Sequence, residues 1–331
     1  MKTKNVLAGP ILVPLDGSAI ADQALGYAKA LAPTGCRIAL LRVVPDLLEF
    51  PSAWQKFAQC VEEAASRYED AASKMLTASA GKYFSGRDLE RVETMVEFGP
   101  PAGQILKIAN RIGASMIIMS SYGIGTIDRP ALGSVADRVS RGANIPVLLM
   151  RPQAHPQTKS GIDRLVVPLD GSSRAEAAVG VAVDLAKQLH VPVQLVTVVD
   201  PTRDFPESPA HLGALSGGFQ KEIESGLATE AEEYLRGISG DVLRAKVPVR
   251  YVVRYGSTAQ VLIDDGNPGD LIVMTSHGRS GQPHWELGGI ATRLLRDGKV
   301  PVLRVRPLPP AEMRVGAEAT FDSESEKNLT V

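Results

Sequence analysis

The sequence predicts an α/β protein with two tandem, Rossmann-like units, each built on a doubly wound, parallel, five-stranded sheet. Short apolar runs of strand length alternate with helical segments along most of the 331 residues, which is the pattern of parallel α/β units. The pattern also occurs twice. Residues 116–147 are similar to residues 271–302, so that Gly123 and Gly133 of the first copy match Gly278 and Gly288 of the second.

The first copy opens with a strand at 11–15 that ends in Asp16-Gly17-Ser18. Ser18 is a suitable N-cap for a helix that extends to Leu31, because apolar residues follow it at three- and four-residue spacing. The remaining elements predicted for this copy are a strand at 38–44, a long helix at about 52–80, a strand at 91–98, a helix after Gly99, a strand at 116–119, a helix that opens at Gly133-Ser134 and a strand at 146–150.

The second copy repeats this order. Its first strand, at 165–169, is followed by Asp170-Gly171-Ser172, which matches Asp16-Gly17-Ser18 of the first copy. The following elements are predicted to be a helix at about 174–190, a strand at 193–199, a long helix at about 219–238, a strand at 249–255, a helix at 258–265, a strand at 271–274, a helix that opens at Gly288-Gly289 and a strand at 301–305.

The stretch between the copies, Arg151 to Gly161, is polar and contains prolines, which is typical of a linker. The last residues of the chain lack periodicity and have few large apolar side chains, which favours a mobile tail. We therefore predict a first domain at 1–152, a linker at 153–161, a second domain at 162–306 and a mobile tail at 307–331.

The expected strand order within each unit is 3-2-1-4-5, which makes strands one and four neighbours. Small ligands of such sheets bind beyond the carboxyl ends of the strands, where the strand order reverses. Asp16 and the loop after Met119 would then face one crevice, and Asp170 and the loop after Met274 would face another. A glycine loop followed by a helix N-terminus suits an anion, because free N–H groups can approach it.

Composition narrows the functional classes. A hydrophobic content of 44% with 22% charged residues is typical of a soluble globular protein, and a net charge of −1 gives no reason to expect nucleic acid or an anionic membrane as partner. No apolar run approaches the roughly 20 residues of a membrane span, and the proline-interrupted N-terminus does not look like a signal peptide. The two cysteines, Cys36 and Cys60, form no metal pattern, so a cytoplasmic setting is predicted.

Four features recur in both copies. They are PLDGS at both first strands, the strand ends LRVV and VTVV, the S-YG and SHG loops, and the helix openings LGSV and LGGI before IPVLLM and VPVLRV. With these features the chain resembles, over about residues 5–306, the universal stress protein family in its tandem form. The family's ATP motif is Gly, two residues, Gly, nine residues, Gly and then Ser or Thr. Both copies keep that spacing.

The resemblance implies an adenine nucleotide, ATP with or without Mg²⁺, at matching positions of both copies. It places adenine and ribose near Asp16, Val43 and Met119, and the phosphates near Gly123, Gly133, Ser134 and Val135. The full set of implied nucleotide-binding residues is Pro14, Asp16, Val43, Met119, Ser120, Gly123, Gly133, Ser134 and Val135 in the first copy, and Asp170, Val198, Met274, Gly278, Gly288 and Gly289 in the second.

The motif is weaker in the second copy. Ser120 and Thr275 stand where the first glycine is expected, while Gly289 stands where the first copy has Ser134. A hydroxyl donor to a phosphate is worth on the order of 1.5–3 kcal/mol, so we predict that the first copy is the better site. Two simpler interpretations stay open: the glycines serve only as turn residues, and the two aspartates serve only to cap helices.

The leading hypothesis is a stress-response protein that binds ATP and acts as a regulatory or binding module. No general base, metal site or catalytic lysine can be assigned, so we predict no catalytic residues. The alternatives are a slow nucleotide hydrolase in which Asp16 and Asp170 hold magnesium, and a nucleotide-free scaffold. The apolar last strands would be exposed edges, and edges tend to pair. In the resembled family this strand joins two domains, so an intramolecular pseudo-dimer is predicted, and a homodimer of chains stays open.

Overall fold

The computed structural model of the chain describes residues 8–44, 58–122, 132–151, 161–200, 217–275 and 288–306, without the side chains of 58–62 and 217–224. The predicted tail at 307–331 and most of the predicted linker lie outside these ranges. No helix in the part of the chain that the structure describes is long and apolar enough to cross a bilayer.

The first half of the chain contains five strands that alternate with helices, in the predicted order. Its elements are β1 (Ile11–Pro14), α1 (Ala19–Asp22), α2 (Ala24–Leu31), β2 (Ile38–Val44), α3 (Ala58–Tyr83), a 3-10 helix (Gly86–Arg91), β3 (Val92–Phe98), α4 (Pro101–Arg111), β4 (Met116–Ser120), α5 (Ser134–Gly142) and β5 (Val147–Met150).

The second half repeats the arrangement. Its elements are β6 (Arg164–Pro168), α6 (Ser173–Leu189), β7 (Val193–Val199), α9 (Gly217–Arg244), β8 (Val249–Tyr255), α10 (Thr258–Asp264), β9 (Asp270–Thr275), α11 (Gly289–Asp297) and β10 (Val302–Val305).

All ten strands form one sheet, in the order β3-β2-β1-β4-β5-β10-β9-β6-β7-β8. Each half therefore has the predicted order 3-2-1-4-5, and its strands run parallel. The halves meet where β5 and β10 pair antiparallel, with Leu148 opposite Leu303 and Val147 opposite Arg304. The two predicted five-stranded sheets are thus joined through the last strands, whose apolar edges cover each other.

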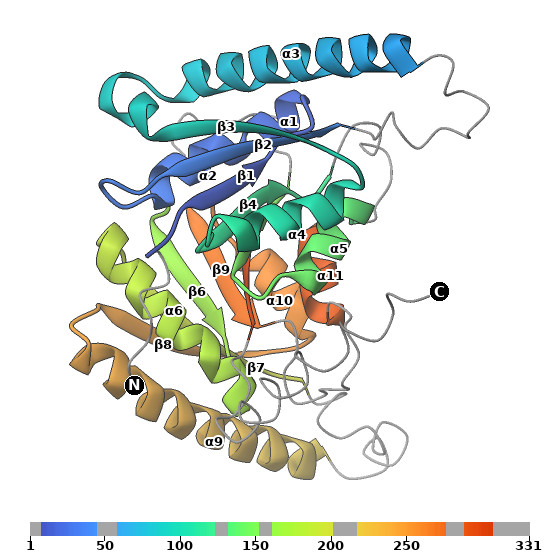
Figure 1. Cartoon of the computed structure of the whole chain (residues 1–331). Coiled ribbons are helices and arrows are strands. Elements are labelled where there is room, and N and C mark those ends of the chain that lie inside the picture. Colours follow the sequence, from blue (N-terminus) through green and yellow to red (C-terminus); the bar gives the residue numbers. More distant parts are fainter. Residues whose placement is uncertain are drawn as a thin grey trace, which may run out of the picture.

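Helices cover both faces of the sheet, and a hydrophobic core lies under each layer. One core includes residues of α2, α3, α6 and α9, among them Leu76 and Leu235, which are fully buried. The other includes residues of α4, α5, α10 and α11, among them Ile108 and Val139. The two long helices, α3 and α9, lie at opposite ends of the sheet (Figure 1). Because parallel strands buried on both faces need apolar residues throughout, β4 reads Met-Ile-Ile-Met before Ser120.

Three local features differ from the sequence prediction. The first helix is broken into α1 and α2 at Gln23, whose N–H bonds to the carbonyl of Ile20, three residues back, at 3.2 Å. A 3-10 helix at Gly86–Arg91 precedes β3. The helix α9 continues six residues beyond its predicted end at Ile238, because Val242 packs into the core and is 1% exposed. The first residues predicted for the helix at 52–80 lie outside the described ranges.

Candidate functional site

The turn after each first strand is fixed by an aspartate and a serine. Asp16 Oδ1 accepts hydrogen bonds from the N–H of Ser18 at 2.9 Å and from its Oγ at 2.6 Å, and Ser18 Oγ in turn accepts from the N–H of Ala21 at 3.1 Å. Gly17 between them has a φ of +86°, a conformation that favours glycine. The serine is therefore the N-cap, as predicted, and the aspartate orients the serine without capping the helix itself.

The second half contains the same turn. Asp170 Oδ1 accepts from the N–H and Oγ of Ser172 at 3.1 and 2.6 Å, and Ser172 Oγ accepts from the N–H of Ala175 at 3.2 Å. Each aspartate thus holds a defined position at the carboxyl end of a strand. A carboxylate has about four acceptor positions, so it can accept from several donors at once.

Replacing Ser172 by alanine is expected to lower the free energy of unfolding by about 1 kcal/mol, because the N–H of Ala175 loses its acceptor at the start of α6. The neighbouring Ser173→Ala is the matched control, since Ser173 is exposed and has no capping role, and it should change stability by less than about 0.5 kcal/mol. Urea denaturation of both variants checks this. Equal losses in the two variants would contradict the capping role.

The predicted adenine-side residues of the first half lie along one edge of the sheet. Because β1, β2 and β4 are parallel neighbours, Pro14, Asp16, Val43 and Met119 all stand at or just after their carboxyl ends. Val43 and Met119 belong to the same hydrophobic core and are 9% and 6% exposed, respectively. The structure therefore brings these four positions to one edge, with an apolar floor on the α4 and α5 side.

The start of α5 is tied to the end of β4. The N–H of Gly133 donates to the carbonyl of Ser121 at 2.9 Å, and the N–H of Ser121 donates to the carbonyl of Met150 at 2.7 Å. Gly133 is the N-cap of α5 and has no side chain that could occupy the N–H groups of the first turn. Ser134, the first residue of the helix, is exposed, and Val135 packs against the core. This end of α5 presents a hydroxyl and backbone donors beside the carboxyl end of β4.

The start of α11 in the second half corresponds to the start of α5 but lacks the hydroxyl. Val198 and Met274 stand near the carboxyl ends of β7 and β9, and both belong to the core under α10 and α11 or pack against it. Gly288 is the N-cap of α11, and Gly289 is its exposed first residue. A Cβ built on Gly289 would meet no heavy atom within 4 Å. A larger side chain therefore fits here.

The two serine or threonine positions at the strand ends are buried. Ser120 is 7% exposed and its Oγ accepts from the N–H of Tyr122 at 3.2 Å, while Thr275 is 5% exposed. Ser120 is thus engaged in a local turn at the end of β4. Gly123 and Gly278, the central glycines of the two predicted loops, lie outside the described residues.

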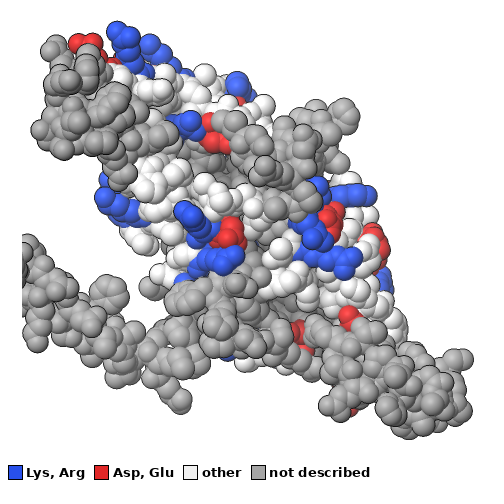
Figure 2. Space-filling view, turned by 90° about the vertical axis from the view of Figure 1, so that its right-hand side faces the viewer, with Lys and Arg blue, Asp and Glu red and all other residues white. Residues whose placement is uncertain are grey.

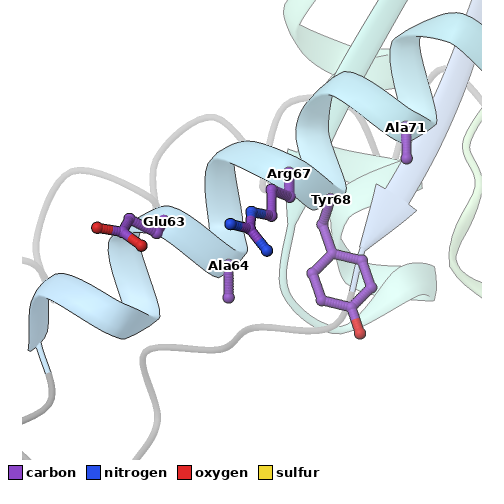
Figure 3. Close-up of a pocket in the computed structure, with 5 residues that line it drawn as sticks. All are labelled: Glu63, Ala64, Arg67, Tyr68 and Ala71. Atoms are coloured by element: carbon purple, nitrogen blue, oxygen red, sulfur yellow. The ribbon is translucent and has the colours of Figure 1, made fainter.

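No group of three or more His, Cys, Asp or Glu side chains is placed to hold a metal ion within the described ranges. A hollow of about 530 Å³ is found on α3, lined by Glu63, Ala64, Arg67, Tyr68 and Ala71 (Figure 3). All five residues come from one stretch of a single helix, and none of them is a predicted site residue. Figure 2 shows one face of the molecule, in the middle of which Lys and Arg side chains lie beside Asp and Glu.

One residue that contacts the far end of α5 was not singled out from the sequence. Arg304 of β10 is 3% exposed, and its guanidinium donates to the carbonyls of Ser140 and, at 3.1 Å, Ala143, at the C-terminal end of α5. The repeat contains a signal for Arg304, because this arginine interrupts an apolar strand at the position where the first copy has Leu149. The apolar pattern predicts the strand but assigns no role to the arginine within it.

Comparisons with known proteins agree with the repeat. The family model described as the universal stress protein family matches residues 8–151 and again residues 161–306. A universal stress protein of Mycolicibacterium smegmatis is 26% identical over 301 residues, which cover 90% of this chain and 97% of that protein. One from Mycobacterium tuberculosis is 25% identical over 322 residues, covering 91% of this chain and 96% of the relative. The crystal structure of a universal stress protein from Archaeoglobus fulgidus is similar in fold, with a TM-score of 0.56 at 19% identity over 90% of this chain and 98% of that one.

Proposed function

Since the chain belongs to the universal stress protein family, we propose that it binds ATP at the carboxyl edge of the first half and acts as a nucleotide-dependent regulatory or binding module of a stress response. The observation that carries the proposal is the start of α5. Its glycine N-cap leaves the first-turn N–H groups without a side-chain acceptor, and the hydrogen bond from Gly133 to Ser121 holds these donors beside β4. A helix N-terminus of this kind attracts phosphate through its N–H groups and its dipole.

In this proposal, adenine packs on the apolar floor made by Val43 and Met119, beside Pro14, and a ribose hydroxyl donates to the Asp16 carboxylate. The phosphates accept hydrogen bonds from the Ser134 hydroxyl and from backbone N–H groups at Gly133, Ser134 and Val135. Gly123, which lies outside the described residues, is proposed as a further phosphate contact. Mg²⁺ would enter with the phosphates, because it prefers phosphate oxygens and water to a dedicated protein cage.

The second half supports a weaker site by the same reasoning. Asp170, Val198, Met274 and Gly288 repeat the arrangement of the first half, with Gly278 in the loop. Gly289 supplies no hydroxyl, and Thr275 stands in place of the motif's first glycine. We assign the better ATP site to the first half for this reason.

We also propose that the halves are two domains, 1–152 and 162–306, which act as an intramolecular pseudo-dimer in the cytoplasm. The pairing of β5 with β10 supports the pseudo-dimer. So does a side-chain bond between the halves, in which Gln188 Nε2 of α6 donates to the carbonyl of Leu31 at the end of α2, at 2.6 Å. The low cysteine content suits a reducing compartment.

The proposal is tested by counting nucleotides. The protein as purified is unfolded, the released nucleotides are identified by liquid chromatography, and the stripped protein is then titrated with ATP in a calorimeter, with and without Mg²⁺. Gly133→Ala should weaken the first site by about tenfold or more, because its Cβ would stand where a phosphate oxygen approaches the backbone. Gly288→Ala is the matched variant. Both glycines have φ values near −60°, so alanine strains neither backbone.

One ATP per chain, lost in Gly133→Ala and kept in Gly288→Ala, is the expected result. Two equivalent ATP molecules would contradict the ranking of the halves. Neither released nucleotide nor binding heat at millimolar ATP would contradict the proposal and leave a nucleotide-free scaffold. Steady phosphate release that needs a metal and disappears in Asp16→Ala would replace the binding module by a hydrolase.

A further inference from the structure

The antiparallel junction between the halves places a buried cation at the end of α5. Arg304 lies on β10 opposite Val147, the first residue of β5, and α5 ends shortly before β5 begins. Its Nη1 donates to the carbonyl of Ser140 and its Nη2 to the carbonyl of Ala143, which is the C-cap residue of α5. The last carbonyls of a helix have no partner within the helix. The second half of the chain therefore supplies donors to a helix of the first half.

The Arg304 guanidinium keeps its positive charge at neutral pH. Burial lowers the pKa of the Arg304 guanidinium to about 10, and repulsion by Arg306 adds to this effect, so Arg304 is still cationic at pH 7. The C-terminal end of a helix carries partial negative charge, which stabilises a cation there. Removing the side chain would leave the carbonyls of Ser140 and Ala143 without these donors in a buried setting.

The other end of the same helix is the proposed phosphate site. The nine residues of α5 span roughly 13 Å, so its two ends are about that far apart. Val139 and Ser140 are fully buried, and a Cβ on Gly142 would lie 2.5 Å from Leu106 Cδ1 of α4, so the C-terminal end is closely packed. The Arg304 guanidinium adds hydrogen bonds to this packing at the C-terminal end of α5. With that end fixed, the first-turn N–H groups at Ser134 and Val135 keep their position relative to β4.

We propose that Arg304 is a positioning residue for the ATP site of the first half: the last strand of the second half holds α5 by its C-terminal carbonyls and so keeps its N-terminus in the phosphate-binding position. This inference rests on the proposed function, since it concerns the same site.

The junction is not symmetric in this respect. Leu149 occupies the position in β5 that corresponds to Arg304 and cannot donate to α11. The C-cap residue of α11, Gly298, accepts from Arg151 Nη1 at 3.5 Å, and Arg151 is only half-buried. Two hydrogen bonds from the buried Arg304 side chain thus hold the end of α5, whereas the hydrogen bond from Arg151 to the end of α11 is long and comes from a half-buried side chain. The half whose helix end is better held is therefore also the half that keeps the hydroxyl residue of the ATP motif.

The test compares three variants of the full chain, each in a Gly288→Ala background so that calorimetry reports on the first site. Arg304→Leu places the first half's own residue at this position, and Arg304→Lys keeps the charge with a single donor group. Arg306→Ala is the control, because Arg306 Nη1 also crosses the junction but donates to a side chain, Asn144 Oδ1, beyond the end of α5. Hydrogen exchange of the α5 amides is measured in the same proteins without nucleotide.

Arg304→Leu is expected to raise the Kd for ATP about tenfold, as it would if the binding-competent position of α5 were populated in a tenth of the molecules. The exchange of the α5 amides that donate within the helix, from Asp137 onward, should accelerate. Arg304→Lys should recover part of both effects, and Arg306→Ala should stay within about twofold of the parent Kd. A loss of global stability alone would neither raise the Kd of the folded protein nor accelerate exchange in α5 selectively.

An unchanged Kd in Arg304→Leu, in a parent that binds ATP, would overturn the inference while leaving the proposed function standing. A parent that binds no ATP would overturn the proposed function. In that case α5 exchange still decides the positioning role, and unchanged exchange in Arg304→Leu would overturn it. If Arg304→Leu does not fold, Arg304→Lys carries the comparison, and parental affinity and exchange in that variant would overturn the inference that the Arg304 guanidinium positions α5.

Discussion

Replacing Asp270 by alanine is expected to lower the free energy of unfolding by about 3–5 kcal/mol, the cost of leaving a buried charge without its partner. Asp270 begins β9 and is 4% exposed. It accepts from Arg164 Nε at 2.8 Å and also from Arg164 Nη2, and its Oδ2 accepts from the N–H of Asn267 at 2.9 Å. The Arg164 side chain is 16% exposed, so water can replace little of this arrangement.

The loss of stability in Asp270→Ala should affect several strands, because the ion pair belongs to a longer hydrogen-bond network across the sheet. Arg164 Nη1 and Arg250 Nε both donate to Gln194 Oε1, at 2.7 and 2.8 Å, which connects β9, β6, β7 and β8 in one row. Removing Asp270 leaves Arg164 Nε and Nη2 and the N–H of Asn267 without their acceptor. The network lies at the amino ends of these strands, away from the proposed nucleotide sites, so ATP affinity should be unaffected.

Arg254→Ala is the matched control for this prediction. Arg254 forms an ion pair with Asp265 at 2.7 Å in which both side chains are 40% or more exposed, and exposed pairs of this kind contribute about 0–1 kcal/mol. Chemical denaturation monitored by circular dichroism gives both values. A loss in Asp270→Ala no larger than that in Arg254→Ala would show that the buried network contributes nothing to stability.

Gly289→Ser is expected to strengthen ATP binding by the second half about 10- to 100-fold, because it supplies the hydroxyl donor that Ser134 supplies in the first half. The change is permitted sterically, since a Cβ at Gly289 meets no heavy atom within 4 Å. Serine is also well suited to the first turn of a helix. Calorimetric titration in a Gly133→Ala background isolates the second site.

The reciprocal variant is Ser134→Gly, which should weaken the first site by a similar factor in a Gly288→Ala background. Gain in one half and loss in the other, from exchange of a single hydroxyl, would identify this residue as the source of the difference between the halves. A second site that stays weak with Gly289→Ser would assign the difference to Thr275 or to the loop around Gly278, and would contradict the role given to the hydroxyl.

The sequence was sufficient to predict the family, the fold class and the strand order. These depend on repeated local signals: buried strands appear as apolar runs, and the DGS turns mark where they end. The capping role of Ser18 was predicted correctly because an N-cap bond joins residues three apart. The nucleotide-binding roles of Asp16, Met119, Ser134 and their counterparts stay predictions, which the ATP titrations described above would test.

The features that the sequence did not predict join residues far apart in the chain. The Arg304 contacts span more than 160 residues, and the Arg164 to Asp270 pair spans 106. No periodicity or short motif reports such pairings, because they arise from the order and direction of the strands. The break at Gln23 was missed for the opposite reason: a single change in hydrogen-bond step leaves the spacing of apolar residues almost intact.

The antiparallel contact between β5 and β10 also determines the directions in which the two proposed binding edges face. All strands of one half run in one direction and all strands of the other half run in the opposite direction, so the carboxyl ends of the two halves lie along opposite borders of the common sheet. Ligands bound beyond those ends would point away from each other. A macromolecule that recognises one loaded crevice could not reach the other, and the tandem chain would present two separate faces to two neighbours, with the ten strands as a rigid spacer between them.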